Sequence, residues 1–337
     1  SKVPPMPYEE VRDFFYARHN HVEELDALAE RIADEEALAP GDARAAVTAR
    51  LARVHGVRVA VARDGEASRV HRTYDAASRV LRLSAHLGEG QMAFEIATQL
   101  AFLEAGSLLE SLSSGTAFST REARALARIG LASYFAGALV LPYARFFEAA
   151  EAERYDIERL GLRFGVGFET VCHRLSTLQR PTMRGVPFFF VRVDRAGNIS
   201  KRQSATAFHF SRIGGTCPLW NLYEAFAQPG RILTQLAEMP DGRTYLWIAR
   251  TVSSTRGGYG APSKTFAVGL GCDARDAHRL VYSKGMDLRD RAAATPIGGG
   301  CKVCEREGCA QRAFPPIGRR LAVDENERRF VPYPVES

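Results

Sequence analysis

Long apolar runs, targeting signals and nucleotide-binding glycine motifs are all missing from this sequence of 337 residues. No run approaches the roughly 20 apolar residues that span a bilayer, and the N-terminal segment 1–8 lacks the apolar core of a signal peptide. No Walker or Rossmann motif, internal repeat or low-complexity tract is present. These absences predict a cytoplasmic protein with no membrane partner. The abrupt N-terminus also indicates that a segment is missing upstream.

A concentrated block of positive charge is missing as well. The formal net charge is +6, which is compatible with nucleic acid or with phosphate-bearing ligands. The arginines are interspersed with acidic residues, however, as on solvated helix faces. Hydrophobic residues make up 46% of the chain, so its composition is that of a globular protein long enough for two domains.

Cysteine is scarce, but three of the six cysteines are crowded together. They form the segment Cys301-Lys-Val-Cys304-Glu-Arg-Glu-Gly-Cys309, and a fourth, Cys272, lies upstream in Gly-Leu-Gly-Cys-Asp. Three thiols within nine residues must converge, and convergent thiols usually hold a metal. The remaining two, Cys172 and Cys217, each stand alone and are predicted to be buried structural thiols.

The cysteine spacing favours an iron–sulfur cluster over a structural zinc ion. Zinc sites with four cysteines usually join two Cys-x-x-Cys pairs, whereas this chain has one pair, a close third cysteine and a distant fourth. Such a layout is commoner for a [4Fe–4S] cluster. The glycines at 298–300 would let backbone N–H groups approach the sulfides, and Gly308 lets the chain turn before Cys309. Zinc remains the alternative, and disulfides are disfavoured because nothing marks the chain as secreted.

Apolar residues at helical spacing dominate the first half of the chain. They predict one helix or a pair of helices over residues 8–36 and further helices over 42–54, 90–109, 120–141, 143–160 and 163–178, with Asp42 able to cap the helix at 42–54. Three short strands are predicted at 57–61, 70–74 and 80–83, separated by turns at Gly65 and at 75–78.

Strands replace helices from Pro187 onward. They are predicted at residues 188–194, 199–203, 207–210, 232–238, 245–251 and 265–270, with one short helix near 219–226. This order predicts an antiparallel sheet flanked by helices, as in sensor domains of the PAS or GAF kind. The predicted fold class is therefore α+β, with a mainly helical module at 1–183 and a sheet domain at 184–337 that carries the cysteine loop.

Residues 42–109 follow the order helix, three strands, helix, which is the core of zinc metallopeptidases. The last helix, Phe94-Glu-Ile-Ala-Thr-Gln-Leu-Ala-Phe102, resembles the motif helix of the ImmA/IrrE family. The resemblance places Thr98 and Phe102 at the histidine positions, Gln99 at the general base and Leu131 at the third ligand. None of these side chains binds zinc or accepts a proton there, so the module is predicted to be a degenerate peptidase without catalytic activity.

Several longer stretches resemble the short-chain acyl-CoA-responsive transcription regulators of the PrpR/RamB type. They run from Tyr8 to Asn20, from Arg163 to Pro181, from Val186 to Gln203, from Gly215 to Trp220 and from Cys301 to Pro316. The resemblance implies control of genes for propionate or acetate use, with acyl-CoA or CoA as effector and promoter DNA bound through an N-terminal helix-turn-helix that this chain lacks. It also implies a [4Fe–4S] cluster held by Cys272, Cys301, Cys304 and Cys309. The chain is thus expected to be a sensor and not an enzyme.

Coenzyme A needs cations for its phosphates, an aromatic for adenine and an apolar slot for the acyl group. The predicted effector site gathers polar side chains of the first helix with two tyrosines of the peptidase-like cleft: Arg12, Tyr16, Arg18, His19, Asn20, Tyr134 and Tyr143. The alternative is that the arginines pair with Asp13, Glu23 or Glu24 on a solvated helix and that the tyrosines are ordinary core residues. A rival phosphate patch is Lys201, Arg202 and Arg212.

The sequence is compatible with three functions. The first is effector binding by a transcription regulator, for which a homodimer is the expectation by analogy with other bacterial regulators. The second is a redox or nitric-oxide sensor that acts through the cluster. The third is a structural zinc module. A cluster that only holds the irregular C-terminal tail together is the minimum role for the cysteines.

Overall fold

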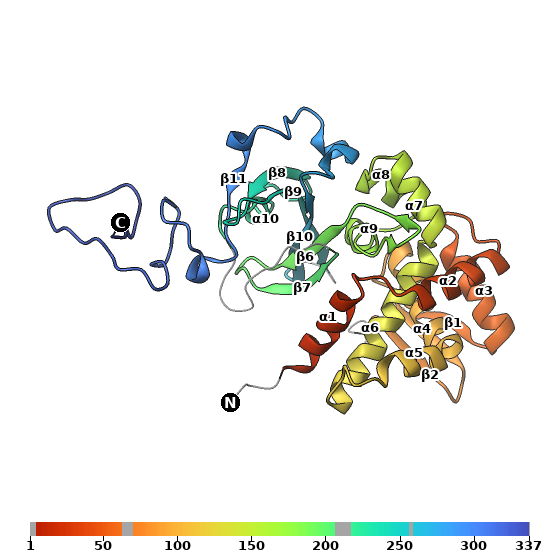
Figure 1. Cartoon of the computed structure of the whole chain (residues 1–337). Helices are drawn as coiled ribbons and strands as arrows, with labels where there is room; N and C mark the ends of the chain where they lie inside the picture. Colours follow the sequence, from red (N-terminus) through yellow and green to blue (C-terminus); the bar gives the residue numbers. More distant parts are fainter. Residues whose placement is uncertain (1–4, 63–69, 206–216, 256–258, 337) are drawn as a thin grey trace. The chain divides into compact units, whose positions relative to one another are not determined.

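The computed structural model describes residues 5–62, 70–205, 217–255 and 259–336. It divides into two compact units, Ser1–Gly185 and Val186–Ser337 (Figure 1). This division falls two residues after the boundary that the sequence predicted. The two units are described separately below.

The first unit is built from helices around a small sheet. Its helices are α1 (Pro7–Ala17), α2 (Glu23–Glu35), α3 (Ala43–His55), α4 (Glu89–Glu104), α5 (Gly106–Ser113), α6 (Arg121–Val140), α7 (Tyr143–Ala152), α8 (Ile157–Phe164) and α9 (Phe168–Leu175). Its strands are β1 (Arg58–Ala62), β2 (Arg72–Asp75), β3 (Val80–Ser84), β4 (Gln179–Arg180) and β5 (Met183–Arg184). The mainly helical module and its three-strand core are therefore confirmed.

Of the two possibilities predicted over 8–36, the structure shows the pair of helices, because the chain turns sharply between α1 and α2. His19 and Asn20 have φ angles of 52° and 59°, in the left-handed region that ends a helix. Asp42 does stand at the N-cap position of α3, but its side chain makes no capping hydrogen bond. The turn predicted at Gly65 lies outside the described residues.

Helix α6 is the centre of the first unit and packs against α1, α2, α4 and α5. Gly130 lets the ring of Phe15 approach to within 3.3 Å of where a Cβ would stand. By length and composition alone α6 could cross a bilayer, which the sequence analysis did not expect. Since 56% of its apolar window is buried inside the protein, its apolar character is that of a core helix.

The peptidase-like core places a three-stranded sheet beside α4. The strand order is β1-β3-β2, with β1 parallel and β2 antiparallel to the central β3. Four of the five residues of β3 are buried, as expected for the middle strand. The N-terminal turn of α4 passes so close to the loop after α8 that a Cβ on Gly90 would lie 2.5 Å from the carbonyl oxygen of Gly165.

The second unit is one six-stranded sheet. Its strands are β6 (Phe188–Val193), β7 (Ile199–Ser204), β8 (Leu233–Glu238), β9 (Thr244–Thr255), β10 (Ser263–Asp273) and β11 (Thr295–Pro296), in the order β11-β8-β9-β10-β6-β7. All neighbours are antiparallel except β11 and β8. The antiparallel sheet is thus confirmed, as is a short helix, α10 (Asn221–Glu224). The predicted strand at 207–210 lies outside the described residues.

The two faces of this sheet carry different residues, because side chains alternate along each strand. One face packs Phe189, Val191, Tyr245 and Trp247 against a cluster that includes Trp220, Leu222, Cys217 and Ile297. Gly269 and Gly271 lie on that face too, where a Cβ would meet Leu222 at 2.7 Å and the Trp247 ring at 2.6 Å. Leu270 and Cys272, which each follow one of these glycines along β10, therefore point to the opposite face of the sheet.

Gly90→Ala is expected to lower the free energy of unfolding by about 1–3 kcal/mol, since the new methyl group would meet backbone atoms that cannot rotate away. The matched control is Gly106→Ala at the start of α5, which has nothing within 4 Å of its Cβ position. An alanine there should leave stability unchanged or raise it by up to about 1 kcal/mol. Urea unfolding followed by circular dichroism measures both, and equal stability of the two variants would refute the close approach.

Candidate functional site

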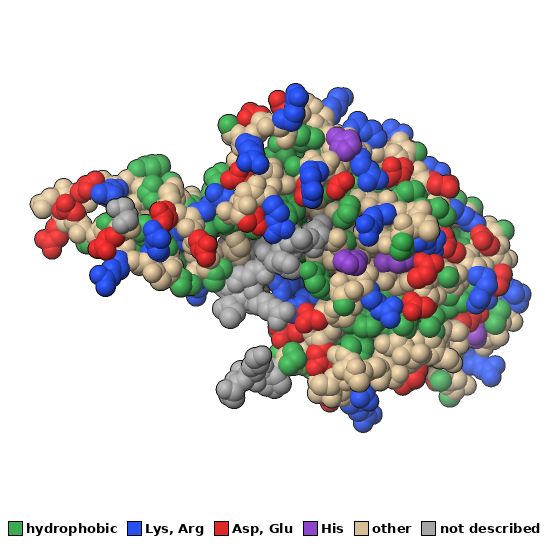
Figure 2. Space-filling model, viewed as in Figure 1, with side chains coloured by type: hydrophobic (Ala, Val, Ile, Leu, Met, Phe, Trp, Pro, Cys, Tyr) green, Lys and Arg blue, Asp and Glu red, His purple; other side chains and the backbone are tan. Residues whose placement is uncertain are grey.

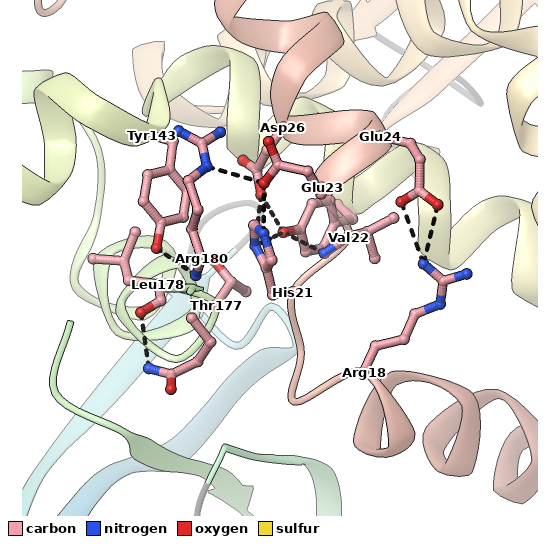
Figure 3. Close-up of polar contacts among 12 residues, drawn as sticks. Arg18, His21, Val22, Glu23, Glu24, Asp26, Tyr143, Thr177, Leu178 and Arg180 are labelled. Atoms are coloured by element: carbon pink, nitrogen blue, oxygen red, sulfur yellow. Dashed lines mark hydrogen bonds and ion pairs between the residues drawn. The ribbon is translucent and has the colours of Figure 1, made fainter. Parts of the chain in front are cut away.

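The arginines predicted to bind the effector are paired with acidic side chains. Arg12 donates to Asp13 at 2.9 Å and lies 3.9 Å from Glu9. Arg18 pairs with Glu24 at 3.3 Å, as Figure 3 shows. This is the solvated-helix arrangement that the sequence left as the alternative. Figure 2 shows the same mixture of basic and acidic side chains over the visible face of the protein.

Asn20 is the predicted effector residue whose environment is unusual. Its side chain is only 1% exposed, yet neither its amide nitrogen nor its amide oxygen has a hydrogen-bond partner within the described ranges. Tyr16, one helical turn earlier, is 41% exposed. A buried amide without partners is costly unless another group satisfies it. Asn20 is therefore a buried amide whose polar atoms are unsatisfied within the described residues.

The two predicted tyrosines have hydroxyls that protein groups already occupy. Tyr134 donates to Asp26 and accepts the backbone N–H of Val22 at 3.0 Å. Tyr143 donates to the carbonyl of Met183 and accepts the backbone N–H of Arg180, both at 2.8 Å. Burial raises the pKa of Tyr143 to about 12, so its hydroxyl stays protonated. Both residues thus serve as polar anchors of the core.

Tyr134 belongs to a buried polar network centred on Asp26 (Figure 3). The carboxylate of Asp26 is paired with Arg174 at 2.6 Å and lies 3.2 Å from Nδ1 of His21. Burial alone would raise the pKa of Asp26, but the charge of Arg174 and the hydrogen bonds from His21, Arg174 and Tyr134 outweigh it and lower this pKa. The network therefore joins α2, α6 and α9 through one ionised carboxylate.

Sequence reasoning missed both members of this ion pair, although a signal was present. Asp26 falls among the buried apolar residues of α2, beside Leu25 and Ala29. Arg174 falls in the same way beside Val171 and Leu175 of α9. A charged residue inside an apolar helix face is expected to find an opposite charge, because burying it alone is costly.

The vestigial peptidase site holds no metal-binding side chains at the predicted positions. The hydroxyl of Thr98 donates to its own helix at the carbonyl of Phe94, 2.8 Å away. Gln99 accepts a hydrogen bond from Arg72, whose guanidinium also lies 5.6 Å from the ring centre of Phe102. Leu131 is fully buried. An arginine from the edge strand β2 therefore contacts the helix face that would hold zinc in an active peptidase.

Four thiols meet in the second unit, but Cys272 is not among them. One pocket is lined by Cys217, Cys301, Cys304 and Cys309. Cys272 lies on β10, opposite Leu246, and points to the other face of the sheet from Cys217. Cys217 is therefore an alternative to Cys272 as the fourth thiol, and the predicted ligand set stays a prediction.

Cys272 and Cys217 have different surroundings. Burial raises the pKa of the Cys272 thiol, and the nearby Asp276 and Asp273 raise it further. Cys217 was predicted to be a structural thiol before Pro218. Its own pKa is raised by burial and, through charge repulsion, by Cys301 and Cys304, which places it beside the loop thiols. A cysteine within the motif from Gly215 to Trp220 was the available signal.

The pocket fits a thiolate-bound inorganic centre. A Cβ on Gly298 would lie 2.6 Å from the Sγ of Cys304, so only glycine leaves room for that thiol. Gly300 has a φ of 142°, which glycine alone adopts readily. Arg306 and Arg312 also line the pocket. Within the described part of the chain, no three ligating side chains stand close enough to share a single metal ion.

The alternative phosphate patch of Lys201, Arg202 and Arg212 lies only in part within the described residues. Lys201 on the edge strand β7 places its ammonium 5.7 Å from the ring centre of Phe190. Arg202 is its neighbour on the strand, and Arg212 lies outside the described residues.

Comparison with known proteins decides the family. The profile of the "Short-chain fatty acyl coenzyme A regulator, C-terminal" family matches residues 177–333, and that of the "IrrE N-terminal-like domain" matches 52–176. The regulator RamB of Mycobacterium tuberculosis is 56% identical over 98% of this chain and 70% of its own length. This chain belongs to the short-chain fatty acyl coenzyme A regulators. It is accordingly a member of a family of transcription regulators and not of an enzyme family.

Other members of the regulator family are also similar to nearly the whole of this chain. PrpR of Mycobacterium tuberculosis is 55% identical over 98% of this chain and 68% of its own length. A protein named "Propionyl-CoA carboxylase regulator" from Cereibacter sphaeroides is 46% identical over 98% of this chain and 70% of its own length. A solved structure of a Mycobacterium tuberculosis transcriptional regulator superposes with a TM-score of 0.94 at 55% identity, covering 98% of this chain and all of the other. The predicted membership of the PrpR/RamB type is confirmed, as is the IrrE-like module.

Arg174→Met is expected to lower the free energy of unfolding at pH 7 by about 3–5 kcal/mol, because it leaves the Asp26 carboxylate buried without its counter-charge. The double variant Asp26→Leu with Arg174→Met removes both charges, so its free energy of unfolding should fall by less than that of Arg174→Met alone. Chemical denaturation at pH 7 separates the two outcomes, and a double variant less stable than Arg174→Met would contradict the argument.

The same pair predicts a pH dependence with a defined sign. The pKa of Asp26 is lower in the folded state, so its contribution to stability is present above its unfolded pKa of about 3.9 and is lost as the pH falls through the lower folded value. Without Arg174, burial raises the pKa of Asp26, so the variant recovers stability as its carboxylate takes up a proton. The stability difference between the wild type and Arg174→Met should therefore shrink as the pH falls toward and through about 4, as measured by chemical denaturation at several pH values.

Proposed function

We propose that this chain is the effector-sensing part of a transcription regulator of short-chain fatty acid use, with acyl-CoA or CoA as the effector. The observation that carries the proposal is the family match over 177–333 beside a peptidase core whose catalytic positions are filled by Thr98, Gln99 and Phe102. Effector binding would bias two arrangements of the protein and so change affinity for promoter DNA through a helix-turn-helix outside this chain. The regulator would work in the cytoplasm, as a symmetric dimer.

The turn between α1 and α2 is the proposed place for the polar part of the effector. The buried, unpartnered amide of Asn20 supports it, since a ligand phosphate or ribose would satisfy that amide. Arg18 supports it as well, because its ion pair with Glu24 lies at the surface and exchanges readily for a phosphate. His19 and Tyr16 flank these two residues. Arg12, Tyr134 and Tyr143 are assigned to the supporting structure because their polar atoms are engaged elsewhere.

We further propose that Cys217, Cys301, Cys304 and Cys309 bind a [4Fe–4S] cluster. The proposal is supported by the lining of one pocket, which brings these four cysteines together with Arg306 and Arg312. Four convergent thiols can hold a cubane cluster, with a structural zinc ion as the alternative. When bound, such a cluster can exchange one electron. The residues of this chain would hold it, exclude bulk water and tie the irregular loop to the sheet.

Cys217→Ser is expected to abolish most of the bound iron, sulfide and visible absorbance of anaerobically purified protein, because a ligand thiolate is lost. Cys272→Ser, on the other face of the sheet, should retain all three and serves as the matched control. Iron and acid-labile sulfide analysis with a visible spectrum measures both. Loss of iron from Cys272→Ser but not from Cys217→Ser would restore the ligand set that the sequence predicted. Zinc without sulfide in the wild type would favour the structural zinc module.

Asn20→Gly is expected to weaken propionyl-CoA binding about tenfold, the equivalent of about 1.4 kcal/mol, because the amide is removed while glycine keeps the left-handed backbone. Arg12→Ala is the control and should bind within about twofold of the wild type, since Arg12 is paired with Asp13. Isothermal titration calorimetry with propionyl-CoA gives both affinities. Unchanged affinity of Asn20→Gly would remove the turn from the proposed site.

A further inference from the structure

Arg312 carries a buried positive charge at the wall of the thiol pocket. The residue is only 5% exposed and lines the pocket with the four cysteines. Its Nη2 donates to the carbonyl of Cys304 at 3.0 Å and to the carbonyl of Arg306, and its Nη1 donates to the carbonyl of Phe314 at 3.2 Å. Its Nε has no hydrogen-bond partner within the described residues. Each acceptor named here is a neutral backbone carbonyl.

The second arginine of the pocket is balanced differently. Arg306 donates to the carbonyls of Ile297 at 2.9 Å and Glu238 at 2.7 Å. It also lies 3.6 Å from the carboxylate of Glu238, which supplies an opposite charge. Arg306 and Arg312 therefore line the same pocket, but only the first has a carboxylate partner among the described contacts.

A buried guanidinium without a negative partner is unfavourable by several kcal/mol. Neutral thiols do not offset this, whereas thiolates bound to a metal centre do, because they leave the centre with a net negative charge. The unpartnered Nε of Arg312 is thus an independent indication that something anionic occupies the pocket.

We propose that Arg312 is the charge-compensating residue of the thiolate centre, with its Nε–H donating to a thiolate or sulfide sulfur. This inference rests on the proposed cluster site and adds a residue that acts on it without being a ligand. A cation and a hydrogen bond next to the sulfurs favour the more negative, reduced form, so Arg312 raises the reduction potential. Through the carbonyls of Cys304 and Arg306 it also holds the loop that carries the ligands. Arg312 is a positioning residue.

The test compares Arg312→Gln with Arg312→Lys and with the control Arg306→Gln. Each protein is reconstituted anaerobically with iron and sulfide and titrated with dithionite at poised potentials, with the visible spectrum as readout. Arg312→Gln should keep its four ligands but shift the ratio of oxidised to reduced cluster at least about tenfold toward the oxidised form, which is 59 mV for a one-electron couple. Arg312→Lys, which keeps the charge, should shift it less, and Arg306→Gln should stay within about threefold of the wild type.

A second measurement uses the metal-free proteins and so stands even if Arg312→Gln reconstitutes poorly. Arg312→Gln and Arg312→Lys both lose the guanidinium hydrogen bonds, but only Arg312→Gln loses the buried charge. Metal-free Arg312→Gln should therefore unfold at a higher midpoint than metal-free Arg312→Lys, and its gain in stability on reconstitution should be smaller. An unchanged potential together with equal metal-free midpoints of these two variants would overturn the role of Arg312 alone. A wild-type protein that takes up no iron or sulfide would overturn the proposed cluster and this inference together.

Discussion

The alternation of side chains along β10 is the constraint on which the thiol pocket depends. Gly269 and Gly271 leave space for Leu222 and Trp247 on one face, and this packing holds the segment around Cys217 against the sheet. Cys272 is the next residue along the strand and consequently faces away. The face to which a residue of β10 points thus decides whether its side chain can reach the cluster around Cys217.

The first unit shows how a fold can keep its architecture while its former catalytic centre is replaced. Arg72 and Gln99 form a hydrogen bond where a metallopeptidase would place a general base, and Phe102 contributes an aromatic face to the same arginine. Elsewhere in the unit, Asp26 and Arg174 pair deep in the core, with Tyr134 and His21 as further partners. The polar interactions therefore specify helix packing, and the module is suited to binding and to transmitting a change of shape.

The proposed sensing elements depend on the same physical rule, namely that buried polar groups need partners. Asn20 and Arg312 each break that rule within the described residues, and each lies where a ligand is proposed. Tyr134 and Tyr143 obey it, and for that reason they are assigned to the core. Other buried atoms without a partner among the described residues, such as the amide oxygen of Gln203 and the hydroxyl of Tyr223, lie outside both proposed sites, so an unpaired atom supports a binding site only together with further observations.

The sequence by itself determined the α+β class, the peptidase-like core with its lost ligands and the regulator family, because these depend on local periodicity and on contiguous motifs. It also identified the loop thiols Cys301, Cys304 and Cys309, which are close along the chain. Only the tertiary structure decided that Cys217 lines one pocket with them, that Asp26 pairs with Arg174, and that Arg312 has no carboxylate partner among the described contacts. These facts join residues far apart in the chain or turn on which face a strand presents, and such long-range contacts leave little trace in local sequence.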